Sequence, residues 1–111
     1  LQGNEVFRWA SRILVSAVRQ LCLETDLRLD DIDWVVPHQA NDRILVCAAR
    51  DLGIGIERFV RNLDRYGNTA AASIPIALGE AATAGRFRPG DRVVLVGFGG
   101  GLTWGAALIE W

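Results

Sequence analysis

The sequence predicts an α/β fold in which helices cover a layered sheet. Two segments repeat apolar residues at the three- and four-residue spacing of a helix face, and two short runs are apolar and β-branched. The two kinds of segment alternate along the chain, as they do in layered α/β domains. With 111 residues, half of them apolar, the chain is expected to form one domain over residues 1–111.

The first predicted helix follows Gly3, with Asn4 as a plausible N-cap. Its apolar face is formed by Val6, Ala10, Ile13, Leu14, Ala17 and Leu21. The helical pattern fades between Thr25 and Leu29. The next element is a short buried strand, residues 34–36, which Pro37 stops.

Two more helices are predicted, from about Ala40 to Leu52 and from Ala70 to Ala84. Gly53 and Gly85 stand just beyond them, where glycine commonly ends a helix. Pro75 falls within the first two turns of the later helix, where its missing N–H group does least damage.

Three further strands complete the prediction. Phe59–Leu63 is a brief strand candidate, and Arg92–Val96 is a clear β-branched run. Leu102–Trp111 is a second extended run, and we expect it to pair with Arg92–Val96 as a hairpin across Gly99–Gly101.

Composition excludes several functions. The net charge is −1, and all 12 basic residues are arginines, so no basic surplus favours nucleic acid as a partner. Cys22 and Cys47 match no zinc or disulfide pattern, and we expect them to be buried free thiols. No apolar run is long enough for a membrane span. We therefore expect a soluble cytoplasmic protein without a metal site.

Three polar or glycine-rich segments follow predicted strands: residues 37–41, 66–69 and 97–101. In open α/β sheets ligands collect at the carboxyl ends of strands. If these strands are parallel, the three segments converge. They would bring together His38, Asn68 and the N–H groups of the glycine loop.

Each of these features has a structural alternative when taken alone. His38 could be a structural histidine, Asn68 could cap a turn, and the glycines could form a hairpin with a bulge. Together they are three N–H donors suited to stabilising negative charge on a carbonyl oxygen. Such a donor typically contributes about 2.7–4 kcal/mol to transition-state stabilisation. No cysteine or serine beside His38 has the context of a nucleophile.

The motifs resemble a known family. They are Val36–Asn41, Asp64–Thr69 with Ala71–Pro75, and Gly97–Trp104, and they are similar to the carboxyl-terminal half of beta-ketoacyl-acyl carrier protein synthase III. Gly3–Phe7 resembles the same family, so the likeness covers essentially the whole chain. Gly99–Gly101 lacks the proline that plant-type polyketide relatives usually carry in this loop.

The resemblance implies a thiolase fold of two similar halves, each a five-stranded mixed sheet with helices on both faces. This chain would be most of the second half, without that half's first strand. The implied enzyme is a homodimeric acyltransferase that condenses acyl-CoA with malonyl-acyl carrier protein, releases carbon dioxide, initiates fatty acid synthesis and needs no cofactor beyond its thioester substrates. Its cysteine nucleophile belongs to the other half, so we expect the isolated chain to be inactive.

The resemblance also implies roles for individual residues. His38 and Asn68 match the catalytic histidine and asparagine, and Gly100 matches the residue whose backbone N–H serves the second oxyanion hole. Carrier-protein binding is implied for Gln39, Ala40, Asn41, Asp42 and Arg43, with Arg43 as the cationic contact. Binding of CoA or pantetheine is implied for Gly3, Asn4, Phe7, Ala40 and Phe98.

Two alternatives stay open at this stage. One is a polyketide starter-unit ketosynthase or acyltransferase, and the other is a non-catalytic fragment that binds a carrier protein or dimerises. We also expect the isolated chain to be unstable or to self-associate, because the helices at 40–52 and 70–84 would lack partners from the missing half.

Overall fold

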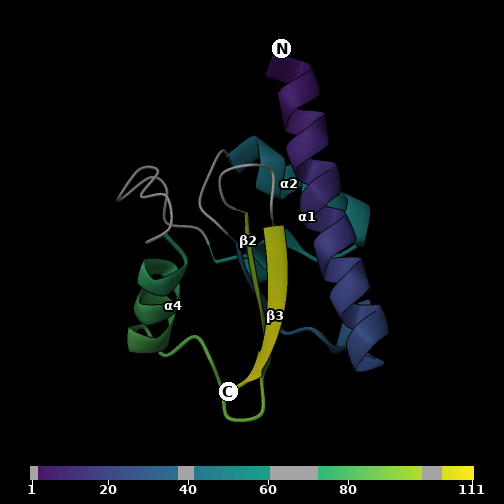
Figure 1. Cartoon of the computed structure of the whole chain (residues 1–111). Helices are drawn as coiled ribbons and strands as arrows, with labels where there is room; N and C mark the ends of the chain where they lie inside the picture. Colours follow the sequence, from purple (N-terminus) through teal and green to yellow (C-terminus); the bar gives the residue numbers. More distant parts are fainter. Residues whose placement is uncertain (1–2, 38–41, 61–72, 99–103) are drawn as a thin grey trace.

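A mixed three-stranded sheet forms the centre of the molecule (Figure 1). The computed structural model describes residues 3–37, 42–60, 73–98 and 104–111. The sheet order is β1 (Trp34–Pro37), β2 (Arg92–Phe98) and β3 (Trp104–Glu110). β1 runs parallel to β2, and β3 runs antiparallel to it, so the predicted hairpin is confirmed.

A single residue pair extends the sheet beyond β1. Phe59 forms an isolated parallel bridge with Val35, and the Val60 N–H donates to the Val35 carbonyl oxygen at 2.9 Å. The predicted strand at 59–63 is therefore a bridge in the part of it that the structure describes. Residues 61–63 lie outside the described part.

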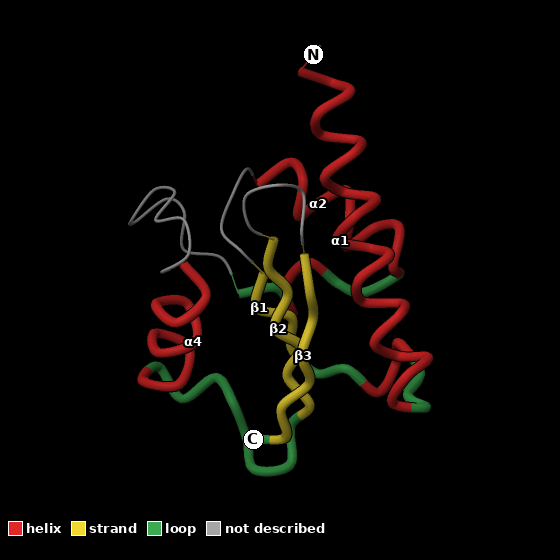
Figure 2. The backbone as a smooth tube through the Cα atoms, viewed as in Figure 1, coloured by secondary structure: helices red, strands yellow, loops and turns green. Residues whose placement is uncertain are grey.

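Helices cover both faces of the sheet, as predicted (Figure 2). α1 (Gly3–Thr25) and α2 (Asp42–Leu52) pack together on one face, and α4 (Ser73–Thr83) packs on the other. Two 3-10 turns, η1 (Leu29–Asp31) and η2 (Ile56–Arg58), were not predicted. Within the described residues, no helix is both long enough and apolar enough to cross a membrane.

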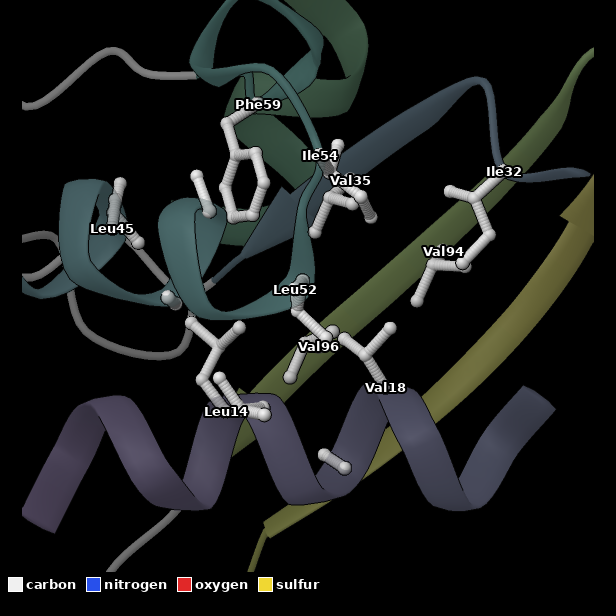
Figure 3. Close-up of a cluster of buried hydrophobic side chains, with 14 of the residues drawn as sticks. Leu14, Val18, Ile32, Val35, Leu45, Leu52, Ile54, Phe59, Val94 and Val96 are labelled. Carbon is white, nitrogen blue, oxygen red and sulfur yellow. The ribbon is translucent and has the colours of Figure 1, made fainter. Parts of the chain in front are cut away.

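Alternation along the strands builds two hydrophobic clusters. Val35, Val94 and Val96 face α1 and α2 in the larger cluster, part of which is drawn in Figure 3. Val36 and Val93 point to the opposite face, where they pack in a cluster with α4. These strands are buried on both faces, which explains why they read as uninterrupted apolar runs.

The predicted stops of α2 and α4 are confirmed. Gly53 and Gly85 have φ angles of 71° and 72°, a left-handed conformation that glycine adopts without steric cost. In each case the next residue, Ile54 or Arg86, donates its N–H back to the carbonyl five residues earlier at 3.0 Å. This is the Schellman pattern. Pro75 is the third residue of α4, within the predicted turns.

One expectation about the helices is wrong. Asn4 lies inside α1 rather than capping it, because the helix already includes Gly3. The helix α2 buries most of its apolar side chains within this chain, while Val46 is exposed, so the expectation that α2 lacks partners from the other half stays a prediction. The buried residues are Ile44, Leu45, Ala48, Ala49 and Leu52, most of which pack in the cluster with α1.

Candidate functional site

Three chain segments leave the sheet at the same edge. Parallel pairing aligns Pro37 with Val96, so β1 and β2 have their carboxyl ends on one side. The bridge between Val35 and Phe59 is also parallel, so the chain at Phe59 and Val60 runs in the same direction as β1 and β2. The parallel direction on which the predicted convergence depends is therefore confirmed. The edge is of the kind where α/β proteins bind ligands.

The order of the strands fixes the spacing of three points, which are the ends of β1 and β2 and the end of the bridged segment at Val60. These points are called the three exits below. β1 lies between Phe59 and β2, and neighbouring strands are about 4.7–4.9 Å apart. The outer two exits are therefore roughly 10 Å apart across the sheet. Pro37 and Val60 are both buried, so two of the three exits are anchored in the core.

The residues predicted to act at this edge lie outside the described part of the chain. They are His38, Gln39, Ala40, Asn41, Asn68 and Gly100. His38 follows Pro37 directly, Asn68 lies between Val60 and α4, and Gly100 lies between β2 and β3. Their placement at one site stays a prediction.

The described candidates lie at the starts of α1 and α2 and at the end of β2. Asp42 and Arg43 open α2, and both are exposed. An acidic residue in a first helical turn is favoured by the helix dipole, which accounts for Asp42. Gly3, Asn4 and Phe7 lie in the first turns of α1, and Phe98 ends β2. The binding roles assigned to these residues stay predictions.

The two cysteines lie within helices, away from the strand ends. Cys22 is buried in α1, and burial, together with the negative charge of Asp31, raises the pKa of its thiol. Cys47 in α2 is only half-buried, so the expectation of two buried thiols is correct for Cys22 alone. In the ranges that the structure describes, no three His, Cys, Asp or Glu residues are grouped to hold a metal ion.

The difference in exposure predicts different thiol reactivity. In the folded chain, Cys47 should react with a disulfide reagent at pH 8 much faster than Cys22, because burial restricts access to the Cys22 sulfur and raises the pKa of its thiol. Reaction rates of Cys22→Ala and Cys47→Ala measured by thiol absorbance test this. The rates should become similar in denaturant, and equal rates in the folded protein would contradict the burial difference.

Comparison with known proteins identifies the family. Residues 22–111 match the family described as 3-oxoacyl-[acyl-carrier-protein (ACP)] synthase III C terminal. The chain belongs to this synthase III family. A beta-ketoacyl-[acyl-carrier-protein] synthase III 2 from Deinococcus radiodurans is 55% identical over 109 residues, which is 98% of this chain and 32% of the relative.

Solved structures of synthase III proteins share the fold. The structure from Thermus thermophilus matches with a TM-score of 0.91 and 50% identity, over 100% of this chain and 35% of that one. The structure from Aquifex aeolicus matches with a TM-score of 0.93 and 40% identity, over 100% and 36%. The predicted thiolase-like fold is therefore confirmed. The chain spans about a third of the length of these relatives.

Proposed function

We propose that this chain is the carboxyl-terminal part of a 3-oxoacyl-acyl carrier protein synthase III. The enzyme would condense an acyl-CoA starter with malonyl-acyl carrier protein and thereby initiate fatty acid synthesis. The observation that supports this most directly is the common sheet edge from which the three motif-bearing segments leave. Membership of the synthase III family supports it independently.

The chemistry assigned to this chain is the stabilisation of an enolate. When the malonyl thioester loses carbon dioxide, the electrons of the broken C–C bond move onto the thioester oxygen. His38 and Asn68 would each donate an N–H to that oxygen as it becomes negative. Donors held in place before the reaction stabilise the transition state more than the neutral carbonyl.

The enolate then attacks the acyl group carried by a cysteine thioester. The new C–C bond forms as the electrons of the acyl C=O bond move onto its oxygen, and the Gly100 N–H would stabilise the resulting tetrahedral oxyanion. The oxyanion then reforms the carbonyl and the cysteine thiolate leaves. Neither Cys22 nor Cys47 is suited to that role, because both lie within helices rather than in a turn that follows a strand. The nucleophile is assigned to the part of the enzyme outside this chain.

Partners follow from the same assignment. Acyl-CoA and malonyl-acyl carrier protein would be substrates, and Arg43 would contact the carrier protein from the start of α2. The remaining portion of the enzyme would be an obligatory partner. A cytoplasmic homodimer is the expected assembly of the whole enzyme.

A chimeric enzyme tests this function. This chain would replace the matching carboxyl-terminal third of the Deinococcus radiodurans relative, to which it is 55% identical. We expect the chimera to release carbon dioxide from malonyl-acyl carrier protein and to form a 3-oxoacyl product when acyl-CoA is supplied. Product is measured by mass spectrometry of the carrier protein.

The matched control is the parent relative, purified and assayed in parallel. A folded chimera that forms no 3-oxoacyl product, while the parent does, would favour a non-catalytic fragment and contradict the proposal. Product formed only from a different extender or acceptor would favour the polyketide alternative.

A further inference from the structure

The starts of β1 and β2 are joined by a reciprocal pair of aspartate contacts. Asp33 stands directly before β1, and its Oδ2 atom accepts the backbone N–H of Arg92 at 2.9 Å. Asp91 stands directly before β2, and its Oδ2 atom accepts the Nε1–H of Trp34 at 3.0 Å. Each aspartate therefore holds the first residue of the other strand. The two contacts together form an aspartate clamp.

Backbone hydrogen bonds hold both aspartates in place. The Asp33 N–H donates to the Arg92 carbonyl oxygen at 3.0 Å, so these two residues are joined twice. The Oδ2 atom of Asp91 also accepts the Arg88 N–H at 2.9 Å, and the Asp91 carbonyl oxygen accepts the Trp111 N–H at 2.8 Å. The clamp lies at the end of the sheet beside the C-terminus marked in Figure 1, and the carboxyl ends of β1 and β2 are at the other end.

The register of β1 against β2 is not set by a tight turn. The two strands are parallel, and the chain between them passes through α2, η2 and α4. In a hairpin the turn fixes the register, and a parallel pair has no such turn. A shift by one residue would move β1 about 3.3 Å along β2 and turn its buried side chains to the opposite face. The clamp opposes that shift because each of its hydrogen bonds joins one strand to the other.

The same register affects two of the motif segments. It starts at the clamp and ends where Pro37 is paired with Val96. His38 follows Pro37 directly, and the glycine loop with Gly100 follows β2. Asn68 instead follows the bridged segment on the other side of β1, so it does not depend directly on the pairing of β1 with β2.

We infer that Asp33 and Asp91 are positioning residues for the condensation step. They keep β1 and β2 in the register in which the Gly100 N–H meets the acyl carbonyl while His38 holds the malonyl oxygen. The inference rests on the proposed function. Decarboxylation uses His38 and Asn68, whereas formation of the C–C bond also uses Gly100. Weakening the clamp should therefore impair condensation more than decarboxylation.

The test measures two products of the chimeric enzyme together. With acyl-CoA and malonyl-acyl carrier protein present, coupled turnover releases one carbon dioxide for each 3-oxoacyl product. An enolate that is not captured takes a proton from solvent and gives acetyl-acyl carrier protein. Asp33→Ala and Asp91→Ala should each lower the 3-oxoacyl product per carbon dioxide about fivefold or more, because a misplacement of about 1 Å can cost about 100-fold in rate. Labelled carbon dioxide and mass spectrometry of the carrier protein measure the ratio.

Three further variants separate positioning from stability. Asp33→Asn and Asp91→Asn keep a side-chain oxygen that accepts the same N–H groups, so they should restore most of the ratio. Arg58→Ala removes the hydrogen bond from Arg58 Nη1 to the Ile32 carbonyl at 3.2 Å, which lies at the same end of the sheet but does not join β1 to β2. It should leave the ratio unchanged. Asp33 is exposed, so water can replace its lost contact and Asp33→Ala should still fold.

The outcomes separate this inference from the proposed function. An unchanged ratio in both alanine variants, or an equal loss of both activities, overturns the positioning role and leaves the function standing. Asparagine variants as impaired as the alanine variants also overturn it, because the acceptor oxygen would then not matter. An unsubstituted chimera that forms no 3-oxoacyl product overturns the proposed function and the inference with it.

Discussion

Replacing His38 with alanine in the chimeric enzyme is expected to lower kcat for malonyl-thioester decarboxylation by about 100- to 1000-fold. Loss of one preorganised donor to an oxyanion typically costs about 2.7–4 kcal/mol of transition-state stabilisation. Asn68→Ala should have an effect of similar size, because its carboxamide is assigned to the same oxygen. Release of labelled carbon dioxide measures both, with KM determined separately.

Gln20→Ala is a suitable control for these variants. Gln20 is exposed on α1, and its side-chain amide donates to Glu24 at 3.1 Å, far along the helix from the strand ends. Its loss should leave kcat unchanged. A decrease of less than threefold in both His38→Ala and Asn68→Ala would show that these side chains do not stabilise the enolate.

Replacing Phe59 with alanine in the chimeric enzyme is expected to lower the free energy of unfolding by about 3–5 kcal/mol. Phe59 is only 2% exposed, and Figure 3 shows its ring among side chains of α2 and β1. Its backbone also forms the parallel bridge with Val35 of β1. Urea unfolding followed by circular dichroism measures the change.

Phe59→Leu separates loss of packing from a general intolerance of substitution. Leucine keeps most of the apolar volume, so this variant should lose much less stability than Phe59→Ala. Equal losses in the two variants, or a loss below about 1 kcal/mol for alanine, would contradict the position of Phe59 in the core.

Local pattern was sufficient to predict most of the fold. The helix stops at Gly53 and Gly85 follow from a requirement for left-handed backbone that glycine meets best. The β2–β3 hairpin follows from β-branched runs on either side of a glycine-rich turn. Each of these signals involves residues close together in the sequence.

Features that depend on distant residues were not predicted. The Trp34 Nε1 group donates to the Asp91 carboxylate at 3.0 Å. The two residues are 57 positions apart in the sequence, and no local pattern predicts their hydrogen bond. The packing of α2 against α1 was not predicted for the same reason, because the two helices are distant in sequence. The aspartate in left-handed conformation at Asp26 was missed because glycine usually occupies such a position.

The candidate site could be predicted only in part. The motifs predict which segments carry chemistry, and the structure adds that β1, β2 and the chain at Phe59 run parallel, as convergence of these segments requires.

A double-mutant cycle on His38 and Asn68 tests the central claim most directly. If both side chains donate to one thioester oxygen, they act as a unit, and His38→Ala/Asn68→Ala should decarboxylate malonyl-acyl carrier protein about as slowly as the slower single variant. If they act on separate steps or separate atoms, the double variant should show the product of the two single effects. That second result would contradict the shared oxyanion site.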